Sequence, residues 1–84
     1  MPDDQERAAL WTRMIPERAD RDDDLDVIGL GAKFVMSGGY IKNAVVRAAY
    51  LAADSGTPIT NELLWRSARA EYEAMGKLSC RAVA

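Results

Sequence analysis

The chain has 84 residues, a formal net charge of −2, no histidine and one cysteine, Cys80. This length supports one small domain, and the acidic balance argues against nucleic-acid binding, which is usually accompanied by a basic patch. No catalytic histidine, disulfide or cysteine zinc site is expected, and no apolar run approaches the roughly 20 residues that span a bilayer. With an acidic N-terminus unlike a signal peptide, the chain is expected to be cytoplasmic and to bind neither metal nor membrane.

The first predicted helix covers residues 4–15. Asp3 or Asp4 can cap it, Trp11 and Ile15 share its apolar face, and Pro16 ends it. Residues 16–23 are highly charged, which favours a solvated connector. The alternative, a cluster of acidic metal ligands, lacks the glycine and distal glutamate of a calcium-binding loop.

A short second helix is predicted over residues 25–34, capped by Asp24. Gly29 and Gly31 either let this helix fray or allow a neighbouring helix to pack closely. One face collects Leu25, Ile28 and Ala32. Phe34 and Met36, which follow, are read as core residues rather than ligand contacts.

The third helix is predicted over residues 38–54. Ser37 is placed to cap it, with its hydroxyl accepting a backbone N–H of the first turn, and Gly56 suits the left-handed residue that ends a helix. The apolar face is narrow and rich in alanine, which suits tight helix packing. It comprises Ile41, Ala44, Val45, Ala48 and Ala52.

The fourth helix is predicted over residues 61–75, with Thr60 as its cap and Gly76 as its end. Its core stripe comprises Leu64, Ala68, Tyr72 and Met75, extended by Trp65. One of the two tryptophans is expected to anchor the core and the other to be partly exposed. Together the segments predict an all-α, compact four-helix bundle over residues 1–78, followed by a flexible C-terminal tail over residues 79–84.

Two glycines open the third helix, although glycine is costly inside a helix. Gly38 and Gly39 therefore suggest that something flat or bulky approaches the backbone. The N–H groups at a helix start are unpaired and carry partial positive charge, which suits a nucleotide or another anion. A plain helix start, where glycine only lets the chain turn, explains the residues equally well.

The chain resembles the C-terminal helical lid of AAA+ ATPases over roughly residues 3–77. In that family a Ser-Gly-small-x-Ile/Leu turn opens a long helix, as residues 37–41 do here. The order of the other segments also fits the family. They are Arg7 with Leu10-Trp11, then Asp24-Leu25-Asp26-Val27-Ile28, then Pro58-Ile59-Thr60 followed by Leu64 and Ala68.

This resemblance implies that Ser37, Gly38, Gly39, Tyr40 and Lys42 contact ATP or ADP, with the glycine backbone against the adenine. It leaves open whether Lys42 or Arg47 senses phosphate. It also implies a large α/β subdomain of the same polypeptide that holds Mg²⁺, and neighbouring protomers in a hexameric ring that remodels proteins. The lid alone is not expected to be an enzyme, because the chain has no G-x-x-x-x-G-K-[ST] phosphate loop.

The main alternative is a stand-alone helical adaptor that buries a helix of a partner protein. It accounts for exposed apolar residues but not for the residue 37–39 turn. A helix-turn-helix DNA-binding domain is a third possibility, which the acidic charge opposes.

Overall fold

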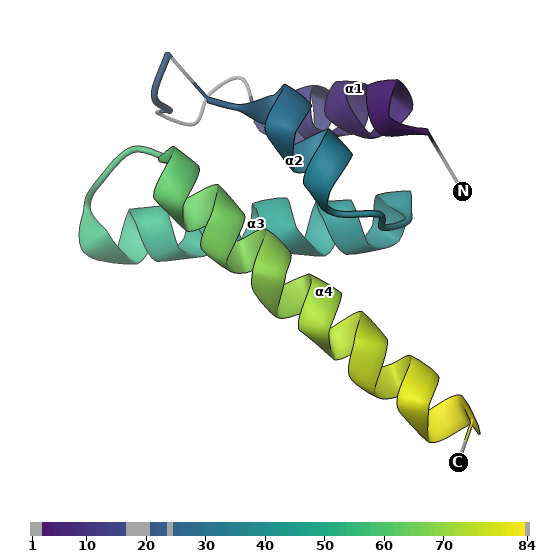
Figure 1. The fold of residues 1–84 in the computed structure, drawn as a ribbon. Coiled ribbons are helices and arrows are strands. Elements are labelled where there is room, and N and C mark those ends of the chain that lie inside the picture. The colour runs from purple at the N-terminus through teal and green to yellow at the C-terminus, as the bar shows by residue number, and fades with distance from the viewer. Residues whose placement is uncertain (1–2, 17–20, 24, 84) are drawn as a thin grey trace.

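Four helices make up most of the protein in a computed structural model, which describes residues 3–16, 21–23 and 25–83. They are α1 (Asp4–Met14), α2 (Val27–Lys33), α3 (Gly38–Ser55) and α4 (Asn61–Val83). In Figure 1, α3 runs across the middle, α1 and α2 lie on one side of it, and α4 crosses it obliquely. α1 packs on α2 and α3, and α4 packs on α3. The predicted all-α four-helix bundle is confirmed.

The core lies where the helices meet, and most of it consists of residues that the apolar patterns indicated; Leu30 and Ile59 are core residues that these patterns did not indicate. All five predicted core residues of α3 are buried, as are Phe34 and Met36 on the link from α2 to α3. Trp11 of α1 is fully buried and anchors the core, whereas Trp65 of α4 is only partly buried. The expectation of one core tryptophan and one partly exposed tryptophan is therefore confirmed.

Local capping explains where most of the helices begin and end. Asp3 caps α1 by accepting the backbone N–H of Glu6 at 2.8 Å. Gly56 ends α3 in the left-handed region, with φ of 66°, which a residue with a side chain seldom adopts.

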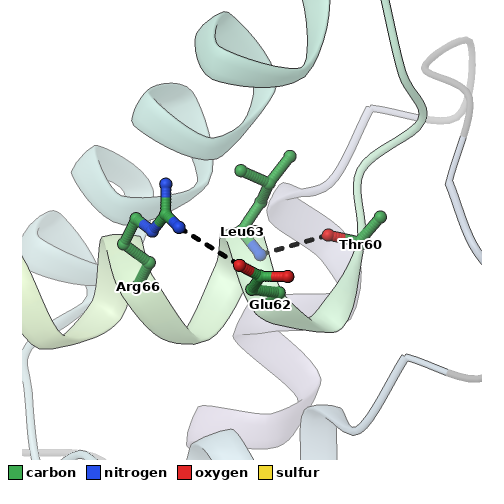
Figure 2. Close-up of polar contacts among 4 residues, drawn as sticks. All are labelled: Thr60, Glu62, Leu63 and Arg66. Carbon is green, nitrogen blue, oxygen red and sulfur yellow. Dashed lines mark hydrogen bonds and ion pairs between the residues drawn. The ribbon is translucent and has the colours of Figure 1, made fainter. Parts of the chain in front are cut away.

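Thr60 caps α4, since its hydroxyl accepts the N–H of Leu63 at 3.2 Å (Figure 2). The adjacent ion pair of Glu62 with Arg66, at 3.1 Å, is exposed and adds only about 0.3–0.5 kcal/mol.

The second helix differs from its prediction in start and in buried face. It begins at Val27, and Asp26 caps it by accepting the N–H of Gly29 at 3.0 Å; the predicted cap, Asp24, lies outside the described residues. Ile28 is 76% exposed and Ala32 is also exposed, whereas Leu30 and Gly31 are buried. The periodicity gave the wrong face because a close backbone contact with α1, rather than apolar side chains alone, orients this short helix.

Gly31 allows that close contact. A Cβ atom built on Gly31 would lie 2.7 Å from the carbonyl oxygen of Asp4 and 2.8 Å from the backbone nitrogen of Ala8. Real Cβ atoms do not come so near to other atoms, so only glycine lets the backbones of α1 and α2 meet in this way. Of the two readings offered for this glycine, close helix packing is confirmed.

The segment between α1 and α2 is fastened to the loop before α4, which the sequence did not indicate. The N–H of Asp22 donates to the carbonyl of Ile59 at 3.0 Å, and the N–H of Asp26 donates to the side chain of Asn61 at 2.7 Å. Residues 17–20 of the predicted charged connector lie outside the described residues. These bonds hold the start of α2 against the start of α4.

The prediction that the fourth helix ends at Gly76 is wrong, because α4 continues to Val83. Its inward face also differs in part, because Ser67 and Glu71 are buried beside Leu64 and Ala68, while Tyr72 is 43% exposed. Gly76 does not have positive φ, and the helix formers around it carry the helix through. The proposed boundary between residues 78 and 79 stays a prediction.

A Gly76→Ala substitution should therefore raise the free energy of unfolding by about 0.5–1 kcal/mol. A Cβ atom at this position meets nothing within 4 Å, so the helix gains without a clash. Urea denaturation followed by far-UV circular dichroism would measure the change. A loss of stability instead would mean that α4 ends at Gly76 in solution.

Candidate functional site

The residues around the start of α3 line one open depression of about 350 Å³. Its lining residues are Ser37, Gly39, Tyr40, Lys42 and Asn43. Four of these were singled out from the sequence, and Gly38, the fifth predicted residue, lies in the same turn. The structure therefore brings the predicted residues together at one place on the surface.

The depression has open hydrogen-bond donors at its edge. The first backbone bond of α3 runs from the N–H of Ile41 to the carbonyl of Ser37 at 3.1 Å, which leaves the N–H groups of residues 38–40 without a partner among the described residues. Ser37 occupies the cap position, but its hydroxyl accepts none of them, so the predicted capping bond is wrong. Three backbone donors and a hydroxyl thus remain available to an anionic or polar ligand.

Among the described residues, no packing contact requires the two glycines at this turn. A Cβ atom on Gly38 would lie 3.8 Å from the nearest atom, on Leu10, and one on Gly39 would lie 4.0 Å from the Ser37 hydroxyl. Both distances are ordinary van der Waals contacts. Gly31 shows the opposite case, since its contact with α1 excludes any side chain. The glycine pair is therefore consistent with a partner that approaches from outside the domain.

Two side chains one turn further along α3 complete the depression. Lys42 is exposed and supplies a positive charge, and Asn43 is exposed and supplies an amide. Asn43 was not among the predicted site residues, although its position four residues after Gly39 places it on the same helix face.

Arg47 forms an ion pair between helices: its guanidinium donates to the Glu71 carboxylate of α4 at 3.1 Å. Glu71 is buried, so this ion pair satisfies a charge inside the α3–α4 contact. Arg47 does not line the depression, which leaves Lys42 as its cation.

Within the described residues, no three His, Cys, Asp or Glu side chains come close enough together to hold a metal ion. None of the helices described is long and apolar enough to cross a membrane.

Comparison with known protein families shows to which family the domain belongs. The family model described as the contractile injection system ATPase helical domain matches residues 3–73, most of the chain. The chain belongs to this family. The match covers α1, α2, α3 and α4 as far as residue 73. No match was found among curated proteins.

This membership confirms that the protein is a helical domain associated with an ATPase, as the resemblance implied. It does not extend to the protein-remodelling lids that the resemblance had suggested. The family description speaks of an ATPase of contractile injection systems, and the start of α3 lies inside the matched residues.

Proposed function

We propose that this helical domain acts as the nucleotide-binding lid of a contractile injection system ATPase. In this proposal the start of α3 closes over the adenine of ATP or ADP held by a large α/β subdomain of the same polypeptide. That subdomain would carry the phosphate loop and Mg²⁺. The observation that supports the proposal is the glycine pair, Gly38 and Gly39. The pair lies beside unpaired N–H groups, and no contact with another described residue requires glycine at either position.

Each feature of the turn has a place in this function. The absent side chains of Gly38 and Gly39 leave room for a flat base against the backbone. The unpaired N–H groups and the positive end of α3 favour a polar, electron-rich ligand. Lys42 lies one turn further and suits a phosphate oxygen. The ion pair of Arg47 with Glu71 keeps α3 and α4 together as the lid moves.

The lid would act mechanically rather than chemically. Because adenine is gripped between lid and large subdomain, binding and release of nucleotide would change the angle between them. In a hexameric ring, contacts with the neighbouring protomer would pass this rotation on. We infer that the motor works on protein components of the injection system. The second candidate function is that of an adaptor that binds only a helix of a partner protein.

We expect an alanine pair, Gly38→Ala with Gly39→Ala, to weaken nucleotide binding about fivefold or more while leaving the fold intact. The added Cβ atoms fit within the domain but enter the space proposed for the base. Amide NMR titrations of the isotope-labelled chain with ATP and ADP would measure this, and shifts should concentrate at residues 37–43. For the isolated domain the dissociation constant should be on the order of millimolar, since most of the pocket belongs to the large subdomain.

Gly76→Ala is the matched control, because it is the same change in a helix outside the depression. It should bind nucleotide as the unchanged chain does. Micromolar binding that survives the alanine pair would place the site elsewhere. ATP turnover by the pure chain would contradict the lid assignment. If the isolated chain shows no shifts, the same pair is tested in the polypeptide that joins the lid to its ATPase, where unaltered nucleotide affinity would overturn the proposal.

A further inference from the structure

A second pocket, of about 390 Å³, lies between the end of α2 and the middle of α4. It shares no lining residue with the depression at the start of α3. Three of the six aromatic residues of the chain gather here. The pocket is lined by Lys33, Phe34, Trp65, Arg69, Tyr72 and Glu73.

Three aromatic side chains line this α2–α4 pocket. The Phe34 ring is buried and meets the rings of Trp65 and Tyr72 edge to face, with centroids 5.5 Å and 5.8 Å apart. Trp65 and Tyr72 are seven residues apart, so both project from the same side of α4. Trp65 is partly exposed and Tyr72 is 43% exposed, which leaves ring surface open to a further aromatic or aliphatic side chain.

Two cationic side chains, those of Lys33 and Arg69, also line the pocket. Lys33 is the last residue of α2, and Arg69 lies on α4 between Trp65 and Tyr72 in the sequence. Both are exposed, and neither forms an ion pair or hydrogen bond with any described residue. Even Glu73, four residues after Arg69, makes no ion pair with it. These two charges are therefore free to meet carboxylates from outside.

We propose that the α2–α4 pocket binds an acidic peptide segment of a partner protein that presents one aromatic side chain. The aromatic ring packs against Trp65 and Tyr72, and flanking carboxylates pair with Lys33 and Arg69. A nucleic acid fits less well, because the chain has a net charge of −2 and nucleic-acid-binding domains usually carry an extended basic patch. This inference does not depend on the nucleotide-binding proposal.

The probe for this proposal is a capped pentapeptide with phenylalanine between two pairs of aspartates. Titrated into the isotope-labelled chain, it should give saturable amide shifts at the lining residues of the pocket. Binding should weaken at least about tenfold when alanine replaces the phenylalanine or lysines replace the aspartates. It should also weaken strongly at about 1 M salt, where charges are screened within about 3 Å.

Variants of the chain separate the charge effect from folding. The pair Lys33→Gln with Arg69→Gln should weaken binding about tenfold or more without loss of structure, because neither side chain has an ion-pair or hydrogen-bond partner among the described residues. Glu73→Gln should strengthen binding about twofold to threefold by removing a repulsion. Arg66→Gln is the matched control on α4, since Arg66 pairs with Glu62 outside the pocket and its loss should not alter binding (Figure 2).

Other results would overturn the proposal. The absence of shifts at several millimolar peptide would show that the pocket does not take this chemistry. Tighter binding of a short oligothymidine at the same residues would assign the surface to single-stranded nucleic acid. Concentration-dependent shifts of the pocket residues in the free chain would assign it to a second copy of the domain.

Discussion

Gly31→Ala should lower the free energy of unfolding by about 2–3 kcal/mol, although alanine is the better helix former. The reason is the contact with α1, where the new Cβ atom would stand 2.7 Å from the Asp4 carbonyl oxygen and 2.8 Å from the Ala8 nitrogen. Both are backbone atoms of a helix and cannot turn aside as a flexible side chain can. α2 must then move away from α1, which loosens the packing around Leu30.

Thermal and urea denaturation followed by circular dichroism would measure this effect. For a domain of this size the expected loss corresponds to a fall in Tm of roughly 8–24 °C. Gly76→Ala is again the matched control. Its new Cβ atom has no neighbour within 4 Å, so this substitution should raise the free energy of unfolding, whereas Gly31→Ala should lower it. A Gly31→Ala variant as stable as the unchanged chain would show that α1 and α2 do not approach this closely.

Arg7→Met should also destabilise the fold by about 2–3 kcal/mol. Arg7 is buried at 6% exposure, and its Nε–H donates to the carbonyl of Gly31 at 2.7 Å. That carbonyl lies in the last turn of α2, where no N–H of the helix itself is available to it. Methionine keeps most of the apolar stem but leaves the carbonyl buried without this donor.

The matched control for this prediction is Arg13→Met on the same helix. Arg13 is exposed, so its loss should change stability by less than about 0.5 kcal/mol. Arg7→Lys should recover only part of the loss, because an ammonium group does not reproduce the guanidinium geometry. Equal stability of the Arg7→Met and Arg13→Met variants would show that the bond to Gly31 contributes nothing.

The Gly31→Ala prediction and the nucleotide experiment distinguish a glycine required by packing from glycines that could serve a ligand. Gly31 is required by a contact inside the domain, while Gly38 and Gly39 have room for a side chain. If the alanine pair leaves stability intact but weakens nucleotide binding, the glycines of α3 serve a ligand. If the alanine pair leaves nucleotide binding unchanged, the two glycines serve only the turn of the chain.

Much of the architecture follows from the sequence by itself. Pro16, Gly56 and Thr60 mark helix ends because each has a backbone or capping preference that acts within a few residues. The buried face of α3 follows from apolar spacing along a long helix. The candidate site at the start of α3 could also be predicted from the sequence, because a helix start and a glycine pair are local sequence signals.

The tertiary structure alone decided the features that depend on contacts between distant residues. The face of α2 is set by the approach of Gly31 to α1, and the bond from Arg7 to Gly31 joins residues 24 positions apart. The pairing of Arg47 with Glu71 and the gathering of Phe34 with Trp65 likewise join separate helices. Spacing along one helix cannot reveal them, because they arise from the distance between backbones and from which partner fills the space between them.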